Sequence, residues 1–162
     1  MATLLISIDR RKSFEEAEEN VNLALEFQTE YPEIVVGIDF SGDARVNRFE
    51  DFFPILSKAQ NQGLKISLHF AEENEESEME FVLSHFKPNR FGHCTFVYPN
   101  FWQKFSDLNI PAELCLTSNV KCGSVKSYQD HHVKHFSVSK LKIVVCYEKP
   151  KMAVILSCNS LR

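Results

Sequence analysis

The chain has 162 residues, of which 44% are hydrophobic and 25% are charged, and its formal net charge is -4. A chain of this length is enough for one domain, or for a large part of a bigger one, and its composition is typical of a globular protein. The acidic balance argues against a nucleic-acid-binding surface, which needs clustered lysine and arginine, and no apolar run reaches the roughly 20 residues that span a bilayer.

The start of the chain and its cysteines indicate an intracellular setting. Met1-Ala2-Thr3 leads into a brief apolar run without a basic segment or a small-residue cleavage site. The five cysteines are scattered and form no C-x-x-C pair, which is typical of reduced thiols rather than of a disulfide framework or a zinc knuckle. We therefore expect a cytoplasmic protein.

Hydrophobic patterning predicts strands and helices in alternation. Apolar runs predict strands at residues 4–8, 34–40, 65–70, 90–94, 111–117 and 142–146. Helical spacing predicts a helix from Ser13, where Glu16 completes a capping box, and further helices at residues 49–62, 75–86 and 100–108. A strand and a helix in each repeat of roughly 20 to 30 residues is the rhythm of parallel β/α units.

Polar side chains follow strand after strand at its carboxyl end. They are Asp9, Asp39 with Gly42 and Asp43, His69 with Glu72, His93, and Ser118 with Asn119. Parallel strands bring these ends to one rim, which is the active site of a (β/α)8 barrel. The alternative, a flavodoxin-like doubly wound sheet, needs a glycine-rich phosphate loop after the first strand, where this chain has Asp9-Arg10-Arg11. We therefore expect an α/β fold, an incomplete (β/α)8 TIM barrel with about six β/α units.

The strand at residues 65–70 carries His69 near its end, and Glu72 follows three residues later. An imidazole can bind a divalent ion while a neighbouring carboxylate handles protons on water or substrate. The alternative is that His69 is a core residue and that the run from Ala71 is the acidic first turn of a helix. The residue pattern by itself leaves both interpretations open.

Five short segments in a fixed order carry a resemblance. They read SIDRR at residues 7–11, GIDFSGD at 37–43, LHFAE at 68–72, RFGH at 90–93 and ELCLTSN at 113–119. Together they resemble the adenosine/AMP deaminase family, and they look most similar to its N6-methyl-AMP deaminase branch. The resemblance implies a metal-dependent hydrolase on a TIM barrel, with one zinc ion, that deaminates a purine nucleoside or nucleotide.

Residue roles follow from the resemblance at the matching positions. His69 matches a zinc ligand. Glu72 matches the acid that contacts the substrate and protonates N1 of the purine, and His93 matches the histidine that orients the hydroxide attacking C6. Asp9 and Gly42 match substrate-contacting positions. The family signature also includes the Ser-Asn pair at residues 118–119, to which we assign no chemical role.

The chain also departs from the family pattern. It contains no His-x-His pair, which the family carries on its first strand as two zinc ligands. Glu148 and Lys149 stand where the family has adjacent aspartates, and only the glutamate could reach a metal. Because a catalytic zinc site needs about three protein ligands, His131, His132 and His135 offer replacements, although the resemblance does not associate them with metal.

We divide the chain into a partial deaminase barrel at residues 1–146 and a divergent tail at residues 147–162, as expected of a truncated or alternatively spliced form. Six strands cannot close an eight-stranded barrel. The resemblance implies a monomer, and the open edge is where we expect any association. Two functions stay open: a zinc-dependent purine deaminase of nucleotide metabolism, or a catalytically inactive remnant that is unstable or binds a partner.

Overall fold

Six parallel strands form one curved sheet in the computed structural model, which describes residues 3–137, 141–149 and 152–154. The strands are β1 (Leu4–Asp9), β2 (Val35–Ser41), β3 (Lys65–Phe70), β4 (Arg90–His93), β5 (Ala112–Leu114) and β6 (Ile143–Val145). Each strand pairs with the next one in the chain, in the order β1-β2-β3-β4-β5-β6. A doubly wound sheet reverses its strand order at a switch point, so this order confirms a partial TIM barrel.

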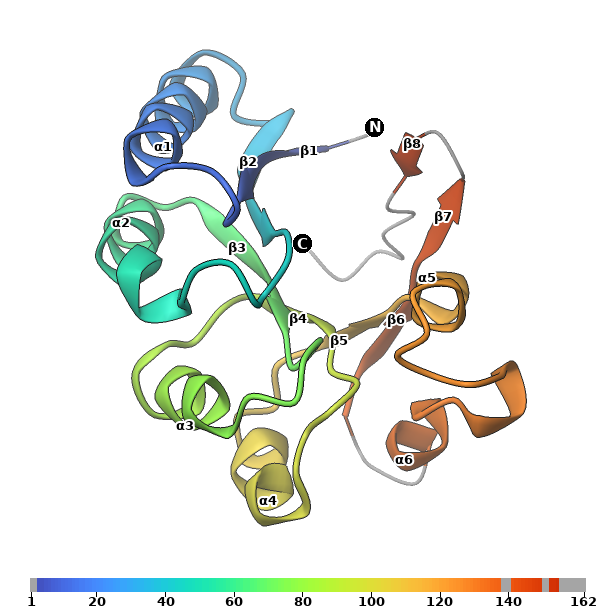
Figure 1. Ribbon diagram of the computed structural model, residues 1–162. Coiled ribbons are helices and arrows are strands. Elements are labelled where there is room, and N and C mark those ends of the chain that lie inside the picture. Colours follow the sequence, from blue (N-terminus) through green and yellow to red (C-terminus); the bar gives the residue numbers. More distant parts are fainter. Residues whose placement is uncertain (1–2, 138–140, 150–151, 155–162) are drawn as a thin grey trace.

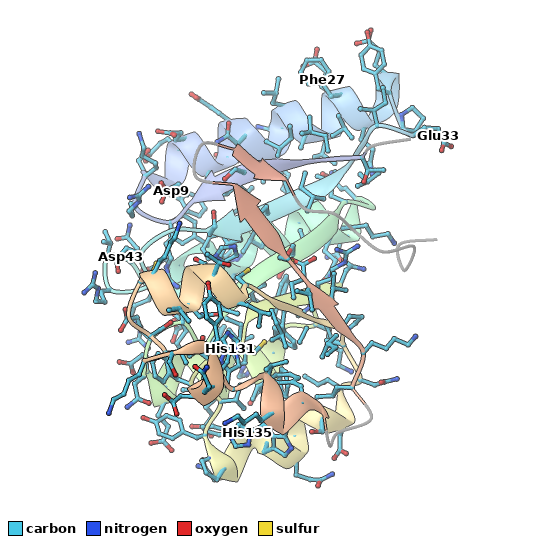
Figure 2. All side chains as sticks on the ribbon, turned by 90° about the vertical axis from the view of Figure 1, so that its right-hand side faces the viewer. Asp9, Phe27, Glu33, Asp43, His131 and His135 are labelled. Atoms are coloured by element: carbon cyan, nitrogen blue, oxygen red, sulfur yellow. The ribbon has the colours of Figure 1, made fainter. Side chains whose placement is uncertain are left out.

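The helices are α1 (Phe14–Glu30), α2 (Phe49–Asn61), α3 (Glu76–His85), α4 (Pro99–Asp107), α5 (Leu116–Lys121) and α6 (Val133–Ser137), with a 3-10 turn, η1 (Tyr128–Asp130). Helices α1 to α4 cover the outer side of the sheet, whereas α5 lies across β6 from α6 (Figure 1). An antiparallel hairpin of β7 (Tyr147–Lys149) and β8 (Met152–Val154) follows β6 and extends back toward β1 on the side opposite α1–α3 (Figures 1 and 2). No helix among the described residues is long and apolar enough to cross a membrane.

The first helix begins where its capping residue predicts. The Ser13 Oγ accepts a hydrogen bond from the Glu16 backbone N–H at 3.2 Å, which satisfies one of the free donors of the first turn. The buried face of α1 is narrower than its apolar spacing suggests, because Leu23 and Phe27 are 42% and 37% exposed. Small residues of α1 do the packing instead: Ala17, Val21 and Ala24.

Aromatic side chains fill the space between the sheet and its outer helices. Phe40 of β2 contacts Phe49 and Phe52 of α2 with ring centroids 5.9 and 5.1 Å apart, and Phe49 reaches Phe86 beyond α3 at 5.4 Å. Burying several such rings is worth a few kcal/mol each. This layer fixes β2 and β3 against α2 and so positions the ends of these strands.

The prediction of one strand over residues 111–117 is wrong in its second half. β5 ends at Leu114, and α5 begins at Leu116, with the Asn119 N–H bonded to the Cys115 carbonyl at 2.9 Å. The cause is tertiary: β4 is four residues long and pairs with β5 only at Ala112 and Glu113. Past this ladder the apolar chain has no partner strand on that side, and it turns into a helix under the end of β4.

Candidate functional site

Strand register brings two histidines together at the carboxyl end of the sheet. His69 of β3 pairs with Gly92 of β4, and Phe70 pairs with His93. Gly92 makes room for the neighbouring imidazole, since a Cβ there would lie 3.2 Å from the His69 Cδ2. The two imidazole rings are 4.6 Å apart between centroids, at a steep angle to each other.

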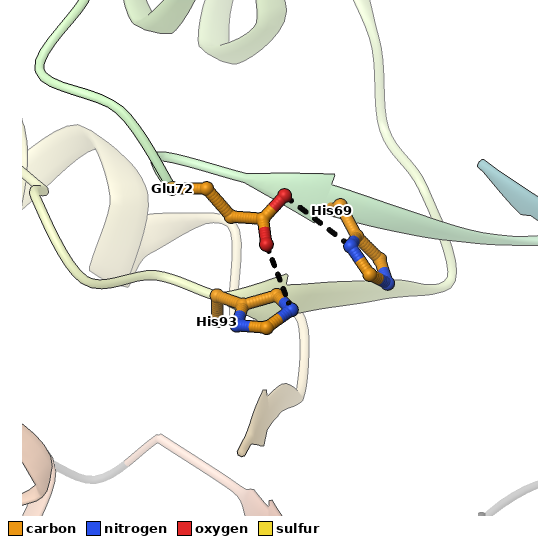
Figure 3. Close-up of side chains that lie close together, drawn as sticks. All are labelled: His69, Glu72 and His93. Carbon is orange, nitrogen blue, oxygen red and sulfur yellow. Dashed lines mark hydrogen bonds and ion pairs between the residues drawn. The ribbon is translucent and has the colours of Figure 1, made fainter. Parts of the chain in front are cut away.

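Glu72 returns to these histidines because the chain reverses after β3. Ala71 has a φ of 51°, a left-handed conformation that few non-glycine residues adopt. The His69 Nδ1 lies 3.3 Å from the Glu72 Oε2, and the His93 Nε2 lies 3.0 Å from the Glu72 Oε1 (Figure 3). One carboxylate therefore bridges two imidazoles. The expectation that these three side chains share one site is met in the geometry.

Burial and charge drive the two histidines to opposite protonation states. Burial disfavours a charged His69, but the hydrogen bond with Glu72 and the negative charge of Asp39 outweigh burial and raise the pKa of His69 to about 9. Burial, together with the positive charge on His69, lowers the pKa of His93 to about 4. At neutral pH His69 is cationic and His93 is neutral, the kind of separation that acid–base sites use.

The carboxylates respond to the same surroundings. Burial tends to raise the pKa of Glu72, but the hydrogen bond with His69 outweighs it, and the pKa of Glu72 is lowered. Burial raises the pKa of Asp39, whose Oδ1 is 3.7 Å from the His69 Nε2. We named Asp39 as a polar residue at a strand end but gave it no role. Its contact with His69 shows it to be part of the site.

These donors suit a metal ion. The ligand atoms of His69, Glu72 and His93 all lie within 4.8 Å of one another, and two imidazoles with a carboxylate form a donor set that zinc accepts. The buried Nε2 of His93 has no well-aligned hydrogen-bond partner among the described residues. A further polar group at this point, a metal ion or its water, would satisfy that nitrogen.

A cavity of about 620 Å³ opens above the three side chains. Its lining comes from the loops after four strands: Ser41, Gly42, Asp43, Ala44, Arg45, His69, Glu72, Glu73, His93, Phe96, Ser118, Asn119, Cys122, Gly123 and Ser124. Gly42 is part of this wall, but Asp9 is not. The Asp9 carboxylate lies behind Gly42, where Arg11 holds it with contacts of 2.5 to 2.9 Å. The volume suits a nucleotide-sized molecule.

A buried ion pair lies between the strands below the site, and the sequence analysis missed it. The Arg90 Nη1 of β4 contacts the Glu113 Oε1 of β5 at 2.5 Å, and the Ser67 Oγ of β3 donates to the Glu113 Oε2 at 3.1 Å. The sequence carries a signal for this pair, because Glu113 lies within the apolar run AELCL at residues 112–116. Charged residues are almost never fully buried without a partner, so such a glutamate calls for a buried cation.

The other proposed metal-binding residues lie apart from this group. The His132 Nε2 donates to the His93 carbonyl oxygen at 2.8 Å, and the ring of His132 stacks on His131 at 4.2 Å. His135 is exposed on α6. Among the described side chains, the only three-donor group within metal-binding distance is the one at His69. The expectation for the Glu148 carboxylate falls outside the described structure, which gives only the backbone there.

Comparisons of the sequence with known proteins find a matching family and related proteins. The family described as adenosine deaminase matches residues 1–155. The adenosine deaminase-like protein of Drosophila melanogaster is 43% identical over 143 residues, which cover 88% of this chain and 42% of that protein. The N6-Methyl-AMP deaminase of Homo sapiens is 37% identical over 161 residues, covering 94% and 45%.

Solved structures give the same relationship. The crystal structure of Arabidopsis ADAL complexed with GMP matches with a TM-score of 0.82 at 40% identity, covering 89% of this chain and 41% of that one. The adenine deaminase of Arthrobacter aurescens, at 20% identity and a TM-score of 0.72, shares the fold. The chain thus spans less than half the length of the relatives it matches.

Proposed function

Because the chain belongs to the adenosine deaminase family, we propose that it contributes to the zinc-dependent hydrolytic deamination of a purine nucleotide or nucleoside, of the N6-methyl-AMP or adenosine type. The observation that carries the proposal is the convergence of His69, Glu72 and His93 beneath one cavity. Relatives named N6-methyl-AMP deaminase and relatives solved with GMP and with IMP support a nucleotide as the substrate.

The zinc ion would be held by His69, with the negative charge of Asp39 and Glu72 favouring a cation there. Bound zinc supplies Lewis acidity, lowering the pKa of water so that it becomes a nucleophile near neutral pH. The same two carboxylates raise the pKa of His69. A proton on His69 therefore competes with a metal cation for the same imidazole. Metal binding weakens as the pH falls for this reason.

The remaining residues handle the purine and the proton transfers. Glu72 would protonate N1 of the ring, which needs its carboxyl group to carry a proton when the substrate is bound. His93 would orient the nucleophile with its Nε2, which lies beside Glu72 at the site (Figure 3). Gly42 would contact the substrate from the cavity wall, and Asp9 would act from behind it by bracing the Gly42 turn.

The alternative function is purine nucleotide binding without turnover. One observation favours it: the described residues supply one group of three donors, and the proposed chemistry needs two of them, Glu72 and His93, for protons and orientation. That leaves His69 as the one dedicated ligand, where catalytic zinc sites have about three. In this case the cavity would still bind a nucleotide.

A zinc and turnover measurement separates the two functions. The purified chain is loaded with zinc, dialysed, and analysed for metal by mass spectrometry, then incubated with N6-methyl-AMP while methylamine release is followed. Stoichiometric zinc with release that Glu72→Gln abolishes supports the deaminase. A chain without zinc and without methylamine release overturns that proposal, and nucleotide binding measured by calorimetry on the same sample then identifies the binding function.

A further inference from the structure

Asn119 lies buried directly beneath His93 and contacts its ring. The side chain extends from α5, and the residue is 3% exposed. The Asn119 Nδ2 lies 3.4 Å from the His93 Nδ1, 2.9 Å from the Thr95 Oγ1 and 3.2 Å from the Ser124 Oγ. None of these contacts belongs to the chemistry proposed above, and the family signature alone gave Asn119 no role.

The neighbouring hydroxyl determines which way the amide faces. The Ser124 Oγ donates its single hydrogen to the Asn119 backbone carbonyl at 3.1 Å. Toward the side-chain amide this hydroxyl can therefore only accept, so the atom that faces it is the amide nitrogen. The opposite atom, the Asn119 Oδ1, has no hydrogen-bond partner among the described residues. A flipped amide would bury its two hydrogens at that position, with no acceptor found for them.

The orientation of the amide determines the position of the proton on His93. A neutral imidazole has one N–H donor and one acceptor nitrogen. The Asn119 amide nitrogen shares two hydrogens among three neighbouring atoms and has no lone pair free to accept one. A proton on the His93 Nδ1 would therefore find no acceptor there, so the Nδ1 is the bare nitrogen. The proton is then on the Nε2, which lies 3.0 Å from the Glu72 Oε1, an atom that can only accept. A cationic ring would also carry a hydrogen on the Nδ1, facing the amide nitrogen of Asn119 at 3.4 Å, so the same contact favours a neutral ring.

We propose that Asn119 is a positioning residue that holds His93 as the Nε2–H tautomer, with the hydrogen on the nitrogen that lies beside Glu72 and not on the one that faces Asn119. The assignment of the tautomer stands on the geometry of Asn119, Ser124 and His93. Its consequence for catalysis rests on the proposed function: His93 meets the nucleophile as a hydrogen-bond donor. The wrong tautomer would present a bare lone pair there instead.

The test measures the tautomer directly, without metal or substrate. The full chain is labelled with 15N-histidine, stripped of metal with a chelator, and studied by imidazole nitrogen NMR at pH 7, where pyridine-like and pyrrole-like nitrogens are separated. The signals of His93 are those that disappear in His93→Gln. We expect a protonated Nε2 and a bare Nδ1 in the wild-type chain. A protonated Nδ1 in the wild-type chain overturns the proposal.

Two variants with one control test the cause. Asn119→Asp replaces the donor by a carboxylate oxygen, so the His93 Nδ1 should gain a proton. Asn119→Leu removes the donor without replacing it, so signals of the Nδ1–H tautomer should appear beside those of the Nε2–H form. Ser118→Ala removes a hydroxyl of the same helix that contacts the Cys122 Sγ and not the amide, and it should keep the wild-type tautomer. If both Asn119 variants keep it as well, Asn119 does not set the tautomer.

These outcomes do not depend on turnover. A chain that binds no zinc and releases no methylamine, yet has the Nε2–H form that Asn119→Asp reverses, would refute the deaminase and leave the role of Asn119 intact. A chain that is active but has His93 protonated at the Nδ1 would do the opposite.

Discussion

Glu113→Gln should destabilise the fold strongly, because it leaves the buried guanidinium of Arg90 without its counter-charge. The side chains of Arg90 and Glu113 are 3% and 6% exposed, and their closest atoms are 2.5 Å apart. The second carboxylate oxygen of Glu113 accepts from the Ser67 hydroxyl. A neutral amide keeps the shape of this group but removes the charge that compensates Arg90.

The magnitude follows from the burial of the pair. Breaking a buried ion pair on one side costs about 3 to 5 kcal/mol, because the remaining charge stays desolvated. A domain has about 5 to 15 kcal/mol of stability in all, so this one change removes a large part of it. The double variant Arg90→Met with Glu113→Leu buries no charge and should lose much less than the sum of the two single changes.

Urea unfolding followed by far-UV circular dichroism measures these differences. The matched control is Glu50→Gln, which breaks the Arg48–Glu50 pair, where the arginine side chain is 65% exposed and the pair is screened by water. We expect that control to lose no more than about 1 kcal/mol. A Glu113→Gln loss as small as the control's would refute the reasoning, as would a double variant that loses the full sum of the single changes.

Three further perturbations test the site and the sheet. His69→Ala should weaken zinc binding at least about 100-fold in equilibrium dialysis, since it removes a ligand. The control His85→Ala on α3 should leave the zinc affinity unchanged. Equal zinc affinities for wild type and His69→Ala would contradict the assignment of His69 as a ligand. Burial lowers the pKa of His132 to about 4 from its ordinary value near 6.5, so between these values only the unfolded chain binds this proton. His132 should therefore lower the free energy of unfolding by up to about 3 kcal/mol as the pH drops from 6.5 to 4, in addition to the contribution of His93. Urea titrations of His132→Gln over this range should show a shallower fall. Gly37→Ala would place a Cβ 2.0 Å from the Lys65 carbonyl oxygen. It should lower the free energy of unfolding by about 1 to 3 kcal/mol, because β2 and β3 must shift apart to make room. An unchanged urea midpoint would contradict this close packing.

Much of the fold could be predicted because its signals are local. The strand at Lys65–Phe70 was predicted with the bounds that the structure has, since its apolar run is limited by Gly63 on one side and by acidic residues on the other. The Ser13 cap likewise marks the start of α1. Strand order also followed, because β/α units of this length connect neighbouring parallel strands. Each inference needed only residues close together in the sequence.

The parts that were missed depend on partners far away in the chain. The end of β5 is set by the short ladder to β4, and the run AELCLTSN continues as an apolar pattern beyond it. The role of Asn119 needs His93, which is 26 positions earlier, and an asparagine after a strand has many other uses. Likewise, the exposure of Leu23 and Phe27 depends on how α1 lies on the sheet, and the spacing of apolar residues along α1 does not reveal this.

Backbone strain links these long-range contacts to the site. Ala71, His93 and Cys94 have φ values of 51°, 60° and 52°, and such left-handed residues cost roughly 1 kcal/mol or more each. A strained backbone of this kind persists where contacts with neighbouring residues hold it in place. Here His132 holds the His93 carbonyl and Asn119 faces its ring, so α5 and the segment before α6 fix the backbone and the side chain of one residue. Strands β3 and β4 bring the donors to one edge, but the direction in which His93 points depends on elements that come later in the chain.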